Sequence, residues 1–447
     1  MSQSGPSRLA LAGRFLVLFG LILQAAYVYL RLVLHGRELW RSTPERLVEA
    51  ERRFARRFVR VAVRFKGGLI KLGQVASLRV DVLPESVSDE LARLQDRVDP
   101  HPSEEVILQL RRELGGTLED HFGSFCREPI AAASLGQVHE ATLPSGERVA
   151  VKVLYPDVER SVAVDLAAAR LGLWLFNFVT VADLGQVYRE LRDSILGELD
   201  YEKEGRAAEE VAANLARDPE VNARVRVPRI HWRATRRRVL TMEFIDGVKI
   251  NDLDALRAQG VDVQELVVWA TRAFLHMIFR DGFFHCDPHP GNLLVDPEGR
   301  IGVIDFGMNK RLAPEVMHML RENLLATVGR DPVRYAQAFL QADMIDPGDV
   351  AAVEEIARIS FDPAYFNLTP REMARIDVPA MVRRLRTQMK QVKSFRLPDG
   401  LVMWSRALTL LMGLASELAP GIRPLEIVGP YVLGFLARPA ENTPGAA

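Results

Sequence analysis

The sequence predicts an α+β protein in which helices dominate both ends and strands are concentrated in the middle of the chain. Residues 41–66 carry apolar side chains at helical spacing among many arginines and glutamates, which is typical of an amphipathic helix. Residues 136–153 instead contain two alternating runs separated by Pro144-Ser145-Gly146, which predicts a β-hairpin. Helical patterns return from residue 314 onward, interrupted by short turns.

The composition is that of a folded protein without net charge. The 447 residues suffice for two or three domains, and 48% apolar residues can furnish a hydrophobic core. Lysines plus arginines and aspartates plus glutamates both number 58, so we expect no nucleic-acid partner. The two cysteines, Cys126 and Cys286, form neither a metal-binding spacing nor a disulfide framework, which suits a reducing compartment. We expect Cys286 to be a small buried side chain rather than a nucleophile.

Residues 1–40 form a hydrophobic N-terminal segment. Phe15 to Leu30 is a run of 16 residues without a charge. A transmembrane helix typically needs about 20 apolar residues, although here apolar residues resume after one arginine. The run is therefore a helix that docks on the protein or lies against a membrane, a single span, or a signal peptide without a clean cleavage site. The apolar stretch Leu401–Leu418 is interrupted by Arg406 and Glu417, which argues against a C-terminal anchor.

We interpret residues 41–125 as an N-terminal helical extension. It contains the segment Lys71-Leu72-Gly73-Gln74 and a short amphipathic helix from Pro102 to Leu114. Glu104 and Glu105 lie in the first turn of that short helix, where negative charge suits the helix dipole. Taken alone, Lys71 and Gln74 are simply polar residues on a helix.

Residues 126–246 are rich in strand patterns and contain two candidate phosphate-binding elements. The spacing Gly-x-Gly-x-x-Gly-x-Val of a nucleotide-binding loop is matched by Ala131-Ala132-Ala133-Ser134-Leu135-Gly136-Gln137-Val138, with alanine at the first two glycine positions. Alanine does not favour positive φ, so we expect a stiffer loop. The next strand ends Val149-Ala150-Val151-Lys152, the pattern of a lysine that binds the phosphates of ATP. The alternative for Lys152 is a solvated lysine on an edge strand.

An acidic segment and a strand end supply further candidates. Glu198-Leu199-Asp200-Tyr201-Glu202-Lys203-Glu204 lies in a helical stretch that we expect to run from Val162 to Leu215 with one break. A kinase pairs a helical glutamate with the strand lysine, and Glu198 or Glu204 could supply it. A solvated acidic helix face is the alternative. Glu243 and Phe244 end a predicted strand, and we expect their backbone groups to be available to an adenine ring.

The densest cluster of candidate residues lies in the predominantly helical region 247–437. Phe284-His285-Cys286-Asp287-Pro288-His289-Pro290-Gly291-Asn292 is followed by the apolar strand Ile301–Ile304 and then by Asp305-Phe306-Gly307. These spacings match the catalytic loop and the metal-binding Asp-Phe-Gly of a kinase. A turn rich in Pro, Gly, Asn and Asp is the alternative for the first segment, but it leaves the second unexplained.

The residue types in this cluster suit phosphoryl transfer. That reaction needs a carboxylate near the attacking oxygen, and it needs an asparagine and a second carboxylate on Mg²⁺. We assign these roles in chain order to Asp287, Asn292 and Asp305. We expect His285 to brace the loop.

The order and identity of these motifs resemble those of the UbiB-type atypical kinases, protein-kinase-like proteins associated with coenzyme Q and other isoprenoid lipids. The resemblance covers roughly residues 60–435. It rests on Lys71–Gln74, Ala131–Ser134, Val149–Lys152, Glu198–Tyr201, His285–Asn292 and Asp305–Gly307. One departure is local, since family members often carry Thr-Arg-Pro-Asp where this chain has Leu78-Arg79-Val80-Asp81.

The resemblance implies a two-lobed protein-kinase-like fold with the helical extension lying over the active site. The N-lobe would be residues 126–246 and the mostly helical C-lobe residues 247–437, followed by a disordered tail at 438–447. The resemblance also implies a regulatory lid in which Lys71 pairs with Glu198, and to which Gln74 and Asp200 belong. Glu204 would then be the partner of Lys152.

The chemistry that the resemblance implies is binding of ATP or ADP with Mg²⁺, by a kinase or a slow ATPase that excludes ordinary protein substrates. The expected partners are a membrane lipid or an isoprenoid-quinone precursor, and enzymes of lipid pathways, at the cytoplasmic side of a membrane. One alternative is a small-molecule phosphotransferase, against which the Lys71 lid and the three alanines argue. The other is a non-catalytic scaffold that binds nucleotide and lipid, against which the intact Asp287, Asn292 and Asp305 argue.

Overall fold

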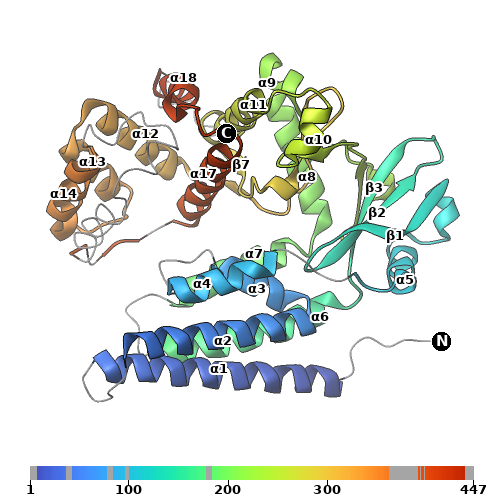
Figure 1. Ribbon diagram of the computed structural model, residues 1–447, viewed down its shortest axis with the longest axis horizontal. Helices are drawn as coiled ribbons and strands as arrows, with labels where there is room; N and C mark the ends of the chain where they lie inside the picture. The colour runs from blue at the N-terminus through green and yellow to red at the C-terminus, as the bar shows by residue number, and fades with distance from the viewer. Residues whose placement is uncertain are drawn as a thin grey trace. The chain divides into compact units, whose positions relative to one another are not determined.

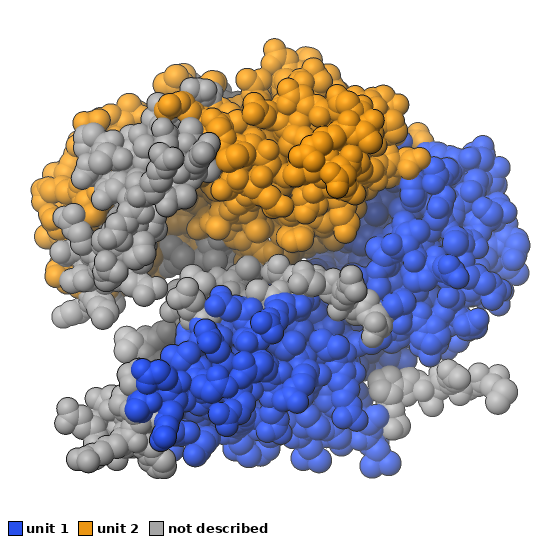
Figure 2. All heavy atoms as spheres, in the orientation of Figure 1, with its two compact units in different colours: residues 1–205, 230–244 blue, residues 206–229, 245–447 orange. Residues whose placement is uncertain are grey.

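The computed structural model describes residues 8–36, 43–77, 84–95, 100–177, 184–361, 391–392, 394–396 and 398–437. The chain divides into two compact units, one of residues 1–205 with 230–244 and one of residues 206–229 with 245–447 (Figure 2). Both contain helices and small sheets, so the architecture is α+β, as the sequence predicts. The predicted tail at 438–447 and the local departure at Arg79 and Asp81 lie outside the described residues.

The first unit combines a group of helices with one antiparallel sheet. Its helices are α1 (Arg8–Gly36), α2 (Pro44–Phe65), α3 (Gly68–Ser77), α4 (Glu85–Ala92), α5 (Ser103–Leu114), α6 (Val158–Asn177), α7 (Leu184–Gly197) and the start of α8 (Tyr201–Leu215), with short turns η1 (Arg93–Gln95), η2 (Leu118–Asp120) and η3 (Trp232–Ala234). Its strands are β1 (Ser124–Ala132), β2 (Gly136–Thr142), β3 (Arg148–Leu154) and β5 (Val239–Glu243), in the order β1-β2-β3-β5. Helices α1, α2 and α6 lie side by side (Figure 1).

Helix α1 contains the apolar run predicted at the N-terminus. Within the described part of the chain it is the one helix long and apolar enough to cross a membrane, by length and composition alone. In this structure α1 packs along α2 and α6, and Leu18 and Leu21 on its inner side are buried.

Arg14 fastens α1 to both of its neighbours. Its Nε and Nη2 donate to the two carboxylate oxygens of Asp165 on α6, each at 2.6 Å. Its Nη1 and Nη2 also donate to the carbonyls of Phe65 and Lys66, at 2.9 and 3.0 Å, where α2 ends. The guanidinium thus makes four hydrogen bonds, two in a bidentate ion pair and two to the C-terminal end of a helix, which suits a cation there.

The sheet of the first unit is built on the hairpin that the sequence predicts. Strands β2 and β3 are antiparallel, and β3 also pairs with β5. Because side chains alternate along a strand, Val149, Val151 and Val153 share one face and enter the core that α5 covers. Lys152 lies on the other face of β3.

The acidic segment is not part of a continuous helix. We expected one break between Val162 and Leu215, but the structure has three helices there, and α7 ends at Gly197 while α8 begins at Tyr201. The Asp200 side chain explains the second break, because its Oδ1 accepts a hydrogen bond from the Lys203 amide at 3.2 Å, in the first turn of α8.

The second unit surrounds two small sheets with helices. Its helices are the rest of α8, α9 (Pro219–Arg224), α10 (Leu253–Ala258), α11 (Val263–His276), α12 (Pro314–Gly329), α13 (Pro332–Gln341), α14 (Val350–Ser360), α17 (Asp399–Leu418) and α18 (Pro424–Ala437), with shorter turns η4 (Met277–Asp281), η5 (Pro290–Asn292) and η6 (Pro347–Asp349). Strands β4 (Val225–Arg226), β9 (Ile301–Val303), β8 (Leu293–Val295) and β6 (Val248–Lys249) form one sheet in this order, and β10 (Asn309–Arg311) pairs with β7 (Phe283–His285).

Candidate active site

Three short strands of the second unit bring Asp287, Asn292 and Asp305 together. Gly282, with φ at +64°, ends the π-helical turn η4, and strand β7 begins at the next residue. Asp287 lies two residues after the end of β7. Strand β8 begins directly after Asn292, and β9 ends two residues before Asp305. Because β8 and β9 are antiparallel neighbours, the amide of Ile304 donates to the Asn292 carbonyl at 3.1 Å.

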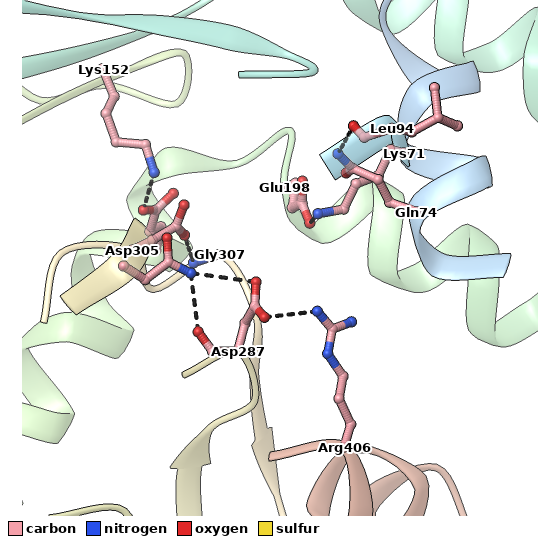
Figure 3. A network of polar contacts seen from close by, with 11 residues as sticks. Lys71, Gln74, Leu94, Lys152, Glu198, Asp287, Asp305, Gly307 and Arg406 are labelled. Carbon is pink, nitrogen blue, oxygen red and sulfur yellow. Dashed lines mark hydrogen bonds and ion pairs between the residues drawn. The ribbon is translucent and has the colours of Figure 1, made fainter. Parts of the chain in front are cut away.

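The side chains of this cluster are held by short-range hydrogen bonds. Asn292 Nδ2 donates to the Asp287 carbonyl at 3.0 Å and lies 3.4 Å from its carboxylate Oδ2 (Figure 3). The Gly307 amide donates to Asp305 Oδ1 at 2.9 Å. The side-chain nitrogen Nδ2 of Asn292 therefore binds Asp287. The side-chain oxygen Oδ1 of Asn292 is the atom of this residue that is suited to bind a cation.

His285 is a buried neutral brace beneath this loop. Its Nδ1 accepts a hydrogen bond from the Asp287 amide at 2.9 Å, and its ring packs edge-on against Phe274 and Phe306. Burial lowers the pKa of His285 from its ordinary 6.5, although the carboxylates of Asp287 and Asp305 oppose this shift. A buried imidazole with a lowered pKa stays neutral at pH 7, which suits support of the loop rather than proton transfer.

Cys286 is the small buried side chain that we expected. It is 1% exposed, and its backbone amide donates to the Met308 carbonyl at 2.8 Å, which joins the two loops of the site. Burial raises the pKa of the thiol to about 12, so at neutral pH it carries no thiolate that could act as a nucleophile.

Arg406 on α17 is a member of the site that sequence reasoning missed. Its Nη2 donates to Asp287 Oδ1 at 2.8 Å, and both side chains are largely buried (Figure 3). The sequence offered one signal, a single arginine inside the apolar run Leu401–Leu418, but we read it only as an argument against a membrane anchor. A charge on an otherwise apolar buried helix face needs a partner, and that partner is the candidate catalytic carboxylate.

The oxygen donors of the cluster fit a magnesium ion that also binds phosphate. Mg²⁺ prefers hard oxygen ligands and is commonly held by one or two carboxylates together with substrate phosphates. The carboxylate of Asp305 and the side-chain oxygen of Asn292 are oxygen ligands of this kind. Within the described ranges, no group of three or more His, Cys, Asp and Glu side chains could hold a metal ion by itself.

In the first unit, Lys152 and Glu204 form a buried ion pair. Lys152 Nζ lies 2.5 Å from Glu204 Oε1, and the two side chains are 10% and 4% exposed. The Nζ atom of Lys152 also lies over the aromatic ring of Tyr201, 5.3 Å from the ring centroid. Of the two glutamates considered from the sequence, Glu204 is the partner of Lys152 in this structure. The pair corresponds to the strand-lysine and helix-glutamate pair of a kinase.

The alanine-rich segment forms the tight end of the β1–β2 hairpin. Ala131 and Ala132 are the last paired residues of β1, opposite Val138 and Gln137, and the Ala133 amide donates to the Gly136 carbonyl at 2.8 Å. Ser134 in the turn is 8% exposed. A Cβ on Gly136 would collide with the backbone of Val153 and lie 2.7 Å from the Tyr201 hydroxyl, so packing alone requires this glycine.

The strand end expected to bind adenine is partly used by the protein itself. Glu243 pairs with Val149 at the end of β5, and the Phe244 amide donates to the Arg148 carbonyl at 3.2 Å. The Arg148 guanidinium also lies over the Phe244 ring, 4.3 Å from its centroid. The Phe244 amide is therefore used within the sheet, and binding of adenine by other backbone groups of Glu243 and Phe244 stays a prediction.

The four residues assigned to a lid lie within the first unit. Lys71 on α3 and Glu198, just after α7, form an ion pair between side chains that are 12% and 14% exposed. Gln74 Nε2 donates to the Leu94 carbonyl at 2.9 Å, which ties α3 to the turn after α4. Asp200 binds the first turn of α8, as described above. The Lys71–Glu198 pair implied by the family resemblance is thus present. Gln74 and Asp200, in contrast, make the backbone contacts just described.

Comparison with known proteins identifies a family whose profile matches residues 93–339 and is described as "ABC1 atypical kinase-like domain". The chain is 35% identical over 400 residues to "Protein ACTIVITY OF BC1 COMPLEX KINASE 8, chloroplastic" of Arabidopsis thaliana, an alignment that covers 82% of this chain and 52% of the relative. It is 32% identical over 378 residues to "Probable protein kinase UbiB" of Marinobacter nauticus, with 83% of this chain and 68% of the relative covered.

The extent of these matches differs between relatives. The chain spans about half the length of the Arabidopsis relative, and 53% of the Synechocystis "Uncharacterized protein sll0005", to which it is 34% identical. A solved structure, "The complex structure of Rv3197-erythromycin from Mycobacterium tuberculosis", is 25% identical, with a TM-score of 0.49 and coverage of 80% of this chain and 93% of that one.

Proposed function

The chain belongs to the ABC1 atypical kinase-like family, and from this premise we propose that it binds ATP or ADP with Mg²⁺ and acts as an atypical kinase or ATPase in membrane-lipid metabolism. The observation that carries the proposal is the cluster of Asp287, Asn292 and Asp305 in the second unit, held by the hydrogen bonds given above. The buried pair of Lys152 and Glu204 in the first unit supports it independently.

In the proposed reaction each group has a separate task. Lys152, oriented by Glu204, would bind the α- and β-phosphates. Asn292 and Asp305 would hold Mg²⁺, which when bound neutralises the charge that develops on the phosphates. Asp287 would accept the proton of the attacking hydroxyl or water. The attacking oxygen bonds to the γ-phosphorus while the bond from that phosphorus to the β–γ bridging oxygen breaks, and ADP leaves.

The lipid part of the proposal rests on different evidence. Two of the relatives described above, from Arabidopsis thaliana and Marinobacter nauticus, carry kinase names, but neither name specifies a lipid substrate. Helix α1 supplies an apolar N-terminal element long enough to reach into a membrane. We therefore propose a membrane lipid, or an isoprenoid-quinone precursor, as the acceptor or activator, at the cytoplasmic side of a membrane.

Release of ADP from ATP by the purified full chain tests this proposal. The measurement compares Mg²⁺ with EDTA, and vesicles of phosphatidylcholine with vesicles that also contain a quinone-like lipid. We expect turnover that requires Mg²⁺ and rises several-fold with the quinone-like lipid. Asp287→Asn is the catalytic control, which should bind nucleotide and lose turnover. Nucleotide binding without turnover in either kind of vesicle would favour the scaffold alternative instead.

Arg406 is expected to act as a positioning residue for this reaction. Arg406→Met removes the partner of Asp287 Oδ1, so we expect kcat to fall about tenfold, less than the roughly 10²–10⁴-fold that a positioned general base contributes in full. Nucleotide affinity should not change, because Arg406 contacts the carboxylate and not the proposed Mg²⁺ ligands. Arg406→Lys should restore part of the rate.

A surface arginine provides the matched control. Arg334 pairs with Glu322 at 2.8 Å in an exposed position of the same unit, and exposed pairs contribute little. Arg334→Met should therefore leave kcat unchanged. Equal rates for the Arg406→Met and wild-type proteins would show that the ion pair with Asp287 has no part in positioning.

A further inference from the structure

The helices of the first unit enclose an apolar cavity of about 230 Å³ that is open at the surface. Its walls come from α1, α2, α3, α6 and α7. Helix α1 contributes Leu18, Leu21, Ile22 and Ala25, and α6 contributes a stretch of small residues that includes Ala169. Each of these helices packs against at least two of the others, and α1, α2 and α6 lie side by side (Figure 1).

The chemistry of the walls selects an apolar ligand. The lining side chains are aliphatic or aromatic, apart from Asp165 and the side-chain-free Gly172. Asp165 is not available to a ligand, because both of its carboxylate oxygens accept from Arg14. An apolar cavity of about 150 Å³ lined by Leu, Ile and Phe stays dry and binds benzene. This larger cavity therefore has room for a longer hydrocarbon group and has no free polar group for a headgroup.

The outer face of α1 indicates where such a hydrocarbon would come from. Leu16, Leu23 and Leu30 recur every seven residues, so they share one face of the helix, and they are 68%, 52% and 53% exposed. Tyr27, also on α1, is 54% exposed. A contiguous exposed apolar face is typical of a surface that contacts a membrane or another protein, and α1 is also long and apolar enough to enter a bilayer. Helix α1 thus has one apolar face toward solvent and another, at Leu18 and Leu21, toward the cavity.

We propose that the cavity binds one hydrocarbon chain of a membrane lipid, which enters from the bilayer beside α1. This inference rests on the proposed function only for the choice of a lipid as the ligand class. The site also has a defined neighbour, since Leu69 and Leu72, which line the cavity, flank Lys71 on α3. The bound chain therefore lies against the helix that carries the Lys71–Glu198 ion pair.

Photo-crosslinking from within the bilayer tests the site directly. The full chain is mixed with phosphatidylcholine vesicles in which one acyl chain ends in a diazirine, irradiated, and digested for mass spectrometry. We expect labelled peptides from the cavity walls on α3 and α6, in addition to peptides from the outer face of α1. The assay contains no nucleotide, so its result does not depend on phosphoryl transfer.

Two phenylalanine substitutions on the same helix provide the matched comparison. Ala169 lines the cavity, whereas Ala167 on α6 is exposed and is not among the lining residues. Ala169→Phe should lower labelling of the cavity walls about tenfold, roughly the effect of excluding two buried methylene groups. Ala167→Phe should leave it unchanged, and labelling of the outer face of α1 should be equal in both. If Ala169→Phe does not fold by circular dichroism, Ala76→Leu on the α3 wall replaces it.

The possible outcomes separate this proposal from the one on which it draws. Labelling confined to the outer face of α1, or wall labelling that is equal in the Ala169→Phe and wild-type proteins, would overturn the cavity as a lipid site. Absence of all labelling would overturn membrane contact as well. Asp305→Asn should label like the wild-type protein, because the cavity does not involve the proposed metal site. Wall labelling of a wild-type protein that shows no ATP turnover would contradict only the proposed function.

Discussion

Replacing Asp305 by Asn is expected to abolish Mg²⁺-dependent protection of the protein by ATP in a thermal-shift assay, and to reduce ATP turnover by a factor of about 100 or more. Asparagine keeps the size of the side chain and can still accept a hydrogen bond from the Gly307 amide at Oδ1. It removes the negative charge that a divalent ion requires. Loop geometry is therefore retained while the proposed metal ligand is lost.

The control for this substitution lies on the same hairpin. Glu298 is in the β8–β9 turn, where its side chain is 65% exposed and pairs with Arg300. Glu298→Gln removes a carboxylate at the surface and should leave both nucleotide protection and turnover at wild-type values. If Asp305→Asn retains full Mg²⁺-dependent protection, the assignment of Asp305 as a metal ligand is wrong.

Arg14→Met is expected to destabilise the first unit by about 3–5 kcal/mol at pH 8, the usual loss when one partner of a buried ion pair is removed. Asp165 would then be buried as an unpaired carboxylate, and the carbonyls of Phe65 and Lys66 at the end of α2 would lose their donor. The free energy of unfolding in urea, followed by circular dichroism, measures the loss.

The loss in Arg14→Met should depend on pH in a defined direction. Burial already raises the pKa of Asp165 to about 6, and Arg14 opposes that shift, so the pKa rises further in the variant. A folded-state pKa above the unfolded value of about 3.9 means that the folded protein gains stability as pH falls through the folded pKa. The destabilisation should therefore shrink between pH 8 and pH 5.

Asp165→Asn in the Arg14→Met background provides the check on this pH dependence. The double variant has no carboxylate at this position. Its free energy of unfolding should therefore not show the gain between pH 8 and pH 5 that we expect for Arg14→Met alone. A loss in Arg14→Met that is the same at pH 5 and pH 8 would show that Asp165 is not the group responsible.

The parts of the fold that the sequence predicted are those determined by neighbouring residues. The hairpin of β2 and β3 follows from alternating apolar residues on both sides of Pro144-Ser145-Gly146. The loop from His285 to Asn292 could be predicted because some of its contacts are local: His285 and Asn292 each bind Asp287, two and five positions away. Local spacing carries enough information for such features.

Contacts between distant segments could not be predicted from local spacing. Arg406 and Asp287 are 119 positions apart, and Arg14 and Asp165 are 151 apart, so their pairing depends on how helices pack. The break at Asp200 was missed for a related reason. Acidic residues favour the first turn of a helix as well as a solvated helix face, and the sequence pattern does not separate these two cases.

The short segment from Glu198 to Glu204 has a thermodynamic consequence. It carries one partner of two largely buried ion pairs in the first unit, Lys71 with Glu198 and Lys152 with Glu204. Only six positions separate the two carboxylates, with the start of α8 at Tyr201 between them, so a movement of the backbone at this helix start would reach both pairs. A ligand that moved both carboxylates would change how Glu204 orients Lys152. By linkage, a nucleotide bound at Lys152, as proposed above, would change the affinity for that ligand by the same factor.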